Sequence, residues 1–438
     1  MINRKIQGRP ETPDFPNGSG LQSTVSSLRS ALRQVNTIKY AFLVPDGAAD
    51  HPLDELGGKT PLQAASTPQM DYLAAHGRLG RVETVPAEMT PGSDVATLSL
   101  LGYDPAKYYE GRGPLEAASM GIKLAEGQMA FRCNLVTVRD RILEDFSAGH
   151  ISTEEAGQLI EKIQVVLGDE SFTFYPGISY RHLMVAKGDF SSAVCRPPHD
   201  VVGKKLEEIL PAGPGSDVLR NLMSRSTEIL GQAEVNRIRE ERKQNPANMI
   251  WLWGQGKAPS MPGIKDKYGI EGAVISAVDL IKGIGRYAGL ECINVPGATG
   301  YFDTDYSAKA RAAIEVLGQK DFVFVHVEAP DEAGHSGSVE EKVRAIESFD
   351  LKIVKPVFEA LKEMGEFKIL IAPDHATPIE VRTHTEEPVP FLIYSSARSY
   401  SGGGDGFDER AAAGSSMVFE HGFELMDFFI GKNGDGGS

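Results

Sequence analysis

The chain has 438 residues, a length that suggests about three domain-sized units and allows a large core without disulfide or metal staples. Hydrophobic residues make up 41 % and charged residues 24 %, which excludes a disordered or fibrous chain. Lys and Arg total 45 against 60 Asp and Glu, and the net charge of -15 argues against nucleic acid or an anionic membrane as a partner.

In chain order, residues 1–37 begin with a stretch rich in Gly, Pro and polar groups, which predicts a disordered N-terminal extension. The apolar run Tyr40 to Val44, followed by Pro45-Asp46-Gly47, predicts a buried strand. Thr60 to His76 fits a helix, with a Thr-Pro start and Gly77 just beyond its end.

The second half of the chain alternates between strands and helices. Buried strands are expected at 322–327, in the segment FKILIAPDH at 367–375, and at 388–395, and a helix is expected from Val339 to Met364. This alternation predicts an α/β fold with a mostly parallel sheet. Such sheets place their chemistry in the loops at the carboxyl ends of the strands.

The middle of the chain has a different character. Residues 125–270 contain short apolar strands, at Ala130 to Val138 and His182 to Val185, and a charged helical stretch at 236–243. We predict an α+β domain inserted here, so that residues 38–124 and 271–438 form one discontinuous domain.

The cysteines and the apolar segments bear on location. Cys133, Cys195 and Cys292 lie far apart and form no CxxC pair, which favours a reducing compartment over a disulfide framework or zinc ribbon. No apolar stretch approaches the ~18 residues of a membrane span, and the N-terminus lacks the apolar region of a secretory signal. We therefore expect a cytoplasmic protein with no membrane partner.

Carboxylate and imidazole side chains follow three of the predicted strands: Asp46, Asp331, His335, Asp374, His375 and, farther along, His384. Taken singly, each has an ordinary structural explanation; Asp46 suits a turn, and Ser93 suits a helix N-cap. Together, these residues would meet at one sheet edge and suit two ions such as Mn²⁺, Zn²⁺ or Mg²⁺. Two ions favour phosphoryl transfer, and Ser93 at a helix start would supply a nucleophile.

Several stretches resemble the cofactor-independent phosphoglycerate mutases of the archaeal type, within the alkaline phosphatase superfamily. They include VPDGAAD, TPGSDVATLSLLGYDP, GRGPLEAASMGI, VPGATGYFDTDY, HVEAPDEAGH and APDHATPIEVRTHTEEPVPF. Matching stretches span about residues 38 to 430 and leave the first 37 outside. The resemblance implies an alkaline-phosphatase-like fold, with a mostly parallel sheet sandwiched by helices and an inserted α+β domain.

The resemblance also implies roles for the clustered residues. Ser93 would be the nucleophile that becomes phosphoserine. One metal ion would be held by Asp331, His335 and His384. The other would be held by Asp46, Ser93, Asp374 and His375. Mn²⁺ is the expected ion, and Zn²⁺, Co²⁺ and Mg²⁺ remain alternatives.

In this family the inserted domain binds the substrate. The residues that would do so here are Arg132, His150 and Arg181, with Lys282 near the domain junction. Asp145 is the candidate general acid and base. The implied activity is an isomerase that interconverts 3-phosphoglycerate and 2-phosphoglycerate in glycolysis and gluconeogenesis, without 2,3-bisphosphoglycerate. The expected partner is therefore a small phosphorylated acid.

Two alternatives remain open. Homoserine kinase-like or phosphatase activity could use the same metal and serine residues, although no nucleotide-binding signature supports a kinase. A non-catalytic protein that retains the fold would have lost a metal ligand or the nucleophile, and none of these positions is altered.

Overall fold

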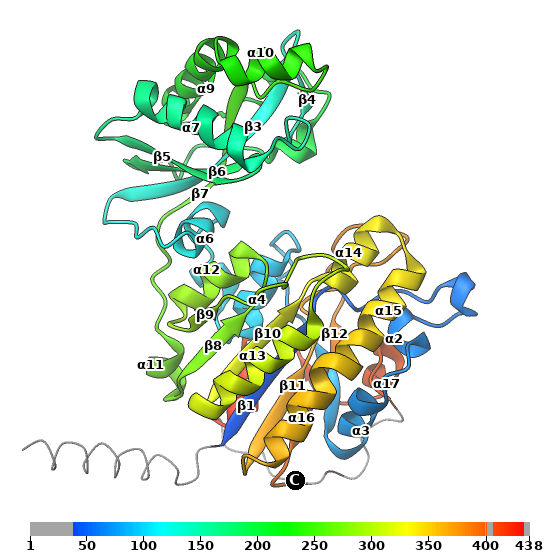
Figure 1. Ribbon diagram of the computed structural model, residues 1–438. Coiled ribbons are helices and arrows are strands. Elements are labelled where there is room, and N and C mark those ends of the chain that lie inside the picture. The colour runs from blue at the N-terminus through cyan, green and yellow to red at the C-terminus, as the bar shows by residue number, and fades with distance from the viewer. Residues whose placement is uncertain (1–37, 399, 401–405, 433–438) are drawn as a thin grey trace, which may run out of the picture. The chain divides into compact units, whose positions relative to one another are not determined.

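The structure is a computed structural model that describes residues 38–398, 400 and 406–432 (Figure 1). The predicted N-terminal extension, residues 1–37, lies outside the described residues. The larger sheet has eight strands in the order β13-β2-β12-β11-β1-β10-β8-β9. Its strands are β1 (Lys39–Pro45), β2 (Arg78–Val82), β8 (Gly272–Ile275), β9 (Glu291–Ile293), β10 (Phe322–Val327), β11 (Phe367–Ile371), β12 (Val389–Ser395) and β13 (Val418–Phe419).

Neighbouring strands of this sheet are parallel except where β12 pairs with β11 and β2. The predicted α/β fold with a mostly parallel sheet is confirmed. The order β11-β1-β10 is central to the site, because the carboxyl ends of these three parallel strands lie next to one another.

Helices cover both faces of the larger sheet. Along β1, Ala41 and Leu43 belong to a core cluster that also contains residues of α13, α15 and α16. Tyr40 and Phe42 project to the other face, where both rings contact Phe429 of α18. The helices associated with this sheet are α2 (Pro61–Ala64), α3 (Pro68–His76), α4 (Ser93–Leu100), α5 (Pro105–Tyr108), α11 (Ile264–Tyr268), α12 (Asp279–Tyr287), α13 (Tyr306–Gln319), α14 (Ala329–Ser336), α15 (Val339–Phe349), α16 (Lys355–Lys362), α17 (Glu409–Ala413) and α18 (Phe423–Ile430), with the short turn η1 (Asp54–Leu56). Helix α6 (Arg112–Ser119) packs against α12 and against a second, smaller sheet.

Two expected helices are interrupted. The segment from Thr60 to His76 forms two helices, α2 and α3, because Pro68 has no amide hydrogen to continue the first and restricts the residue before it. Thr60 does cap α2, in a capping box with Gln63. The helix expected from Val339 contains a π-helical turn, η3 (Asp350–Val354), directly before the proline-containing start of α16.

A smaller antiparallel sheet is built from residues 128–256. Its strands are β3 (Gln128–Arg139), β4 (Ile142–Asp145), β5 (Phe172–Ile178), β6 (Arg181–Lys187) and β7 (Met249–Gly256), and β3 pairs with β4, β6 and β7. Its helices are α7 (Thr153–Leu167), α8 (Leu206–Ile209), α9 (Ser216–Gly231) and α10 (Glu234–Glu241), with the short turn η2 (Pro198–Val201). The sheet and its helices share a second core cluster.

All three cysteines are free, and Cys133 is buried in the smaller sheet. Within the described part of the chain, no helix combines the length and the apolar character that a membrane crossing requires.

Candidate active site

The carboxyl ends of β1, β10 and β11 deliver most of the predicted metal ligands. Asp46 follows β1 directly, and Asp374 and His375 lie shortly after β11. Asp331 and His335 lie one helical turn apart on α14, which begins just after β10 (Figure 1). This segment after β10 is a short helix, with Pro330 near its start and Gly337 at its end.

The first group consists of Asp331, His335 and His384. The Nε2 atom of His335 lies 3.2 Å from Asp331 Oδ2, and the Nε2 atom of His384 lies 3.4 Å from Asp331 Oδ1. The two Nε2 atoms are 3.0 Å apart. His335 Nδ1 is held by the backbone oxygen of Arg382, so that Nε2 is directed toward Asp331.

The second group consists of Asp46, Asp374 and His375, which are all buried. The Nε2 atom of His375 lies 3.5 Å from both Asp46 Oδ1 and Asp374 Oδ2. Neither of these carboxylate oxygens has a hydrogen-bond partner among the described residues. Burial raises the pKa of the Asp46 carboxyl well above its usual value, and the neighbouring Asp374 and Asp331 raise it further.

Buried carboxylate oxygens without partners are costly unless positive charge accompanies them, so this donor set fits a cation. Two sets of three residues each bring their ligand atoms within 4.8 Å of one another. One set is Asp331, His375 and His384, and the other is Asp46, Asp374 and His375. His375 belongs to both combinations, and its ring centroid lies 4.0 Å from that of His384. The described residues can therefore hold divalent metal ions in adjoining positions.

Ser93 is the first residue of α4, and its side chain does not cap the helix. Its Oγ lies 3.1 Å from His375 Nε2, beside the second group. The residue before it, Gly92, has an extended backbone with φ 177°. The ordinary explanation of Ser93 as an N-cap is therefore wrong, because the hydroxyl points toward the metal-ligand candidates instead of the helix amides.

A buried chain of polar groups that was not predicted from the sequence lies beneath Asp46 and Asp374. His326 of β10 directs Nε2 toward Asp46 Oδ2, at 3.4 Å, and Asp374 Oδ2, at 3.7 Å. Its Nδ1 lies 3.2 Å from Glu328 Oε1. Burial would lower the pKa of the His326 imidazole, but Asp374 and Glu328 outweigh burial and raise that pKa to about 9. A signal was present in the sequence, since a histidine inside the apolar run FVFVHV is unusual in a buried strand.

Thr377 is a second missed residue. Its hydroxyl donates to Asp331 Oδ1 and also lies 3.2 Å from His375 Nδ1. It therefore orients one ligand candidate from each group, as residues around metal ligands commonly do. A threonine three residues after a strand-end aspartate gave no distinctive signal in the sequence.

The predicted substrate-binding residues lie mostly in the smaller sheet. Arg132 of β3 is buried, forms a 2.8 Å ion pair with Glu116, and stacks its guanidinium 4.5 Å from the Trp253 ring centroid. Arg181, at the start of β6, is exposed and lies close enough to Glu116 to lower the pKa of that carboxyl, although burial raises it overall. The structure therefore places both arginines around Glu116 of α6.

The other three candidates occupy different surroundings. Asp145 is the last residue of β4 and His150 lies in the turn that follows, where the backbone amides of Ser147 and Gly149 donate to Asp145. Burial would raise the pKa of the Asp145 carboxyl, but these bonds and one from Asn245 lower it. Lys282 lies on α12 of the larger sheet, 3.8 Å from Asp279. No described contact joins Asp145, His150 or Lys282 to the metal-ligand candidates.

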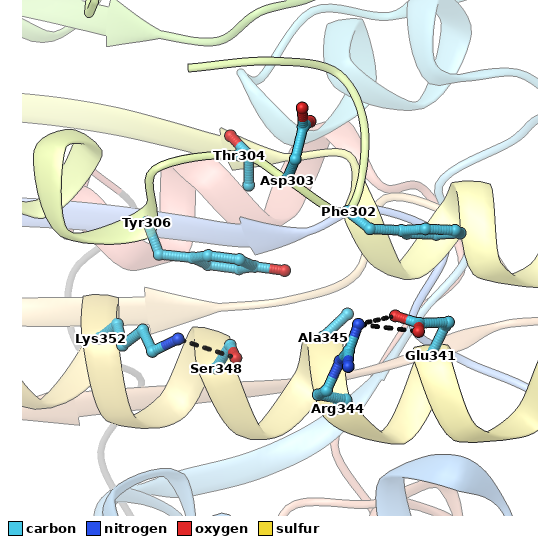
Figure 2. Close-up of a pocket in the computed structure, with 9 residues that line it drawn as sticks. All are labelled: Phe302, Asp303, Thr304, Tyr306, Glu341, Arg344, Ala345, Ser348 and Lys352. Carbon is cyan, nitrogen blue, oxygen red and sulfur yellow. Dashed lines mark hydrogen bonds and ion pairs between the residues drawn. The ribbon is translucent and has the colours of Figure 1, made fainter. Parts of the chain in front are cut away.

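A pocket lies apart from the metal-ligand candidates, beside the start of α13. It has a volume of about 340 Å³ and is lined by Tyr306, the preceding loop and parts of α15 and η3 (Figure 2). Its cations are already engaged, because Arg344 pairs with Glu341 and Lys352 donates to Ser348. None of the predicted site residues lines it, so we do not assign the reaction to this pocket.

Comparisons with known proteins agree with the resemblance. Residues 74–236 match the family model described as 2,3-bisphosphoglycerate-independent phosphoglycerate mutase. A protein of that name from Methanosarcina barkeri is 53 % identical over 395 residues, which cover 90 % of this chain and 99 % of the relative. A probable mutase of the same name from Geobacter sulfurreducens is 50 % identical over 399 residues, with coverages of 90 % and 100 %.

Solved structures give the same result. A protein from Pyrococcus horikoshii matches with a TM-score of 0.77 and 28 % identity, over 92 % of this chain and 100 % of that one. The cofactor-independent phosphoglycerate mutase from Thermoplasma acidophilum matches with a TM-score of 0.64 and 26 % identity, over 91 % and 100 %.

Proposed function

The chain belongs to the 2,3-bisphosphoglycerate-independent phosphoglycerate mutases, and on that premise we propose that it interconverts 3-phosphoglycerate and 2-phosphoglycerate through a phosphoserine at Ser93. The observation that carries this proposal is the position of Ser93 Oγ, 3.1 Å from His375 Nε2 beside the unpartnered carboxylate oxygens of Asp46 and Asp374. A serine held against a cation site can act as a phosphoryl acceptor.

Two divalent ions complete the proposed site, and Mn²⁺ is the ion we propose. Asp331, His335 and His384 would hold one ion, and Asp46, Asp374, His375 and Ser93 would hold the other. When bound, the ions supply positive charge that favours the serine alkoxide and the phosphoryl oxygens. Carboxylate oxygens and imidazole nitrogens are suitable ligands for Mn²⁺.

The chain's own groups then perform two transfers. Ser93 Oγ forms a bond to phosphorus as the bond between phosphorus and the 3-oxygen of the substrate breaks. The Asp145 carboxylate takes up the proton that the serine hydroxyl loses and passes it to the 3-oxygen. The glycerate turns, and its 2-hydroxyl gives a proton back to the Asp145 carboxylate. The 2-oxygen then bonds to phosphorus and Ser93 is released.

We propose that residues 125–270 form the substrate-binding domain and that Arg132, His150, Arg181 and Lys282 bind the acid. Guanidinium groups suit a carboxylate because they offer paired donors in a plane. The glycerate must stay bound and water must be excluded between the two transfers, since otherwise the phosphoserine would hydrolyse. We place the reaction in the cytoplasm, which the free cysteines support.

The test is a coupled assay with 3-phosphoglycerate and Mn²⁺ in the absence of 2,3-bisphosphoglycerate. Wild type should form 2-phosphoglycerate, and Ser93→Ala should not, although its metal content should stay near two ions per chain. Ser99→Ala changes a serine of the same helix α4 and serves as the matched control. Release of free phosphate in place of 2-phosphoglycerate would make the protein a phosphatase and overturn the proposal.

A further inference from the structure

Arg112 is an arginine that the sequence analysis did not assign to the site. It is the first residue of α6, and its Nε donates to Asp94 Oδ2 at 2.9 Å. The Tyr109 hydroxyl donates to the same oxygen at 2.7 Å. Asp94 is buried and directly follows Ser93, so these contacts fix the guanidinium one residue away from the proposed nucleophile.

The guanidinium of Arg112 also lies close to Gly92, the residue before the proposed nucleophile. A Cβ atom at this position would lie 3.2 Å from Arg112 Nη2 and 2.8 Å from Asp94 Oδ1. The backbone of Gly92 is extended, with φ 177°, and any residue could adopt it. The glycine is therefore needed for space, and Nη2 of Arg112 lies against the residue that precedes Ser93.

Arg112 also neighbours the proposed substrate arginine. A Cβ atom at Gly254 would lie 3.5 Å from Arg112 Cβ and 3.7 Å from Arg132 Cγ and Cδ. Arg132 is tied to α6 as well, through its 2.8 Å ion pair with Glu116. Arg112 thus stands between the nucleophile and the residue proposed to bind the acid, two groups that were predicted separately from the sequence.

The way Arg112 is held differs from that of a purely structural arginine. In Arg239, Nε, Nη1 and Nη2 donate to Asn245 O, Glu155 Oε2 and Ala148 O, and the side chain is 3 % exposed. The bond from Arg112 to Asp94 uses Nε, which leaves the two terminal amino groups outside it, and the side chain is 29 % exposed. Arg112 therefore keeps donors and an open side for a ligand.

We propose that Arg112 binds the phosphoryl group while it is transferred to and from Ser93, and that Asp94 and Tyr109 are its positioning residues. This inference rests on the proposed function of Ser93. A guanidinium presents paired donors that match phosphoryl oxygens, and it stabilises the negative charge that these oxygens carry during transfer.

The test measures the binding of inorganic phosphate to the Mn²⁺-loaded protein by titration calorimetry. Arg112→Met should weaken phosphate binding about tenfold or more, because it removes charged hydrogen bonds. It should also lower kcat of the mutase reaction by about 10²- to 10³-fold, and Arg112→Lys should recover part of both losses. Arg344→Met removes an exposed arginine paired with Glu341 and should change neither quantity.

Metal content and circular dichroism identify variants that have lost the site as a whole. If Arg112→Met does not fold, Arg112→Gln, which retains a donor for Asp94, takes its place. Wild-type phosphate affinity in a folded variant with wild-type metal content would overturn the role of Arg112. The titration measures phosphate binding and needs no turnover. If the wild-type protein lacked mutase activity, the proposed function would be overturned, and the phosphate affinities of wild type and Arg112→Met would still test the role of Arg112.

Discussion

Replacement of Lys309 by methionine should destabilise the fold beneath the candidate metal site. Lys309 of α13 is 0 % exposed, and its Nζ donates to Glu328 Oε2 at 2.7 Å and to the backbone oxygen of His326 at 2.9 Å. Glu328 is 3 % exposed and lies against His326, which in turn faces Asp46. The lysine therefore supplies positive charge to a carboxylate that solvent does not reach.

The expected loss follows from what Lys309→Met leaves behind. Removing one partner of a buried ion pair costs about 3–5 kcal/mol, because the other charge stays buried without compensation. Glu328 Oε1 would still accept hydrogen bonds from Ser276 Oγ, at 2.9 Å, and Ala277 N, at 3.0 Å, and would still lie 3.2 Å from His326 Nδ1. These remaining donors place the loss near the lower end of the range, at about 3 kcal/mol.

The assay is urea unfolding at pH 7, followed by circular dichroism. Lys362→Met, which removes an exposed lysine paired with Glu359, is the matched control and should leave the midpoint unchanged. The double variant with Glu328→Gln should recover part of the loss, since no buried charge is left alone. A loss below about 1 kcal/mol for Lys309→Met would refute the reasoning that the pair is an essential buried charge partner.

Three further predictions concern single positions. Burial raises the pKa of the Glu409 carboxyl to about 7, so the folded state favours the protonated carboxyl. The stability that this protonated form contributes is fully present below pH 4.5 and is lost as the pH rises through 7. Glu409→Gln should therefore gain up to about 3 kcal/mol relative to wild type between pH 5 and pH 8 in urea unfolding, and parallel pH profiles would contradict this. His326→Gln should weaken Mn²⁺ binding by about 10- to 100-fold in titration calorimetry, and unchanged affinity would show that His326 does not orient the ligands. Gly334→Ala should lower the thermal midpoint although alanine favours helices, because its Cβ would lie 2.3 Å from the backbone oxygen of Thr377. The control is Gly157→Ala in α7, where a Cβ would have nothing within 4 Å, and this variant should raise the midpoint.

The position of the metal-ligand candidates could be predicted because it depends on local sequence and a simple rule of topology. The apolar runs that became β1, β10 and β11 are short and bounded by turn residues, and each is followed within a few positions by a carboxylate. Parallel neighbours end at the same sheet edge, so their following residues meet there. His384 gave a weaker signal, because a long loop after β11 brings it back to Asp331.

The buried cations could not be predicted, because their partners are distant in the chain. Lys342 lies in the charged segment VEEKVRAIES, which suggests a solvated helix, yet it is 0 % exposed. Its Nζ donates to Asp50 Oδ2 at 2.7 Å, 292 positions away, and to the backbone of Thr377 at 2.8 Å. Only tertiary structure reveals such a pairing, since helical periodicity describes a residue's face and not what covers it.

The networks around the site share one physical logic. Lys309 compensates Glu328 beneath Asp46 and Asp374, while Lys342 compensates Asp50 and holds the backbone of Thr377, whose hydroxyl orients Asp331. In each network a buried lysine neutralises a carboxylate that is not a ligand candidate. Among the described residues no lysine or arginine pairs with Asp46, Asp331 or Asp374, and His326 is the cationic neighbour of Asp46 and Asp374. A buried site arranged in this way keeps its unbalanced negative charge at the ligand atoms, where a divalent ion is the compensating charge.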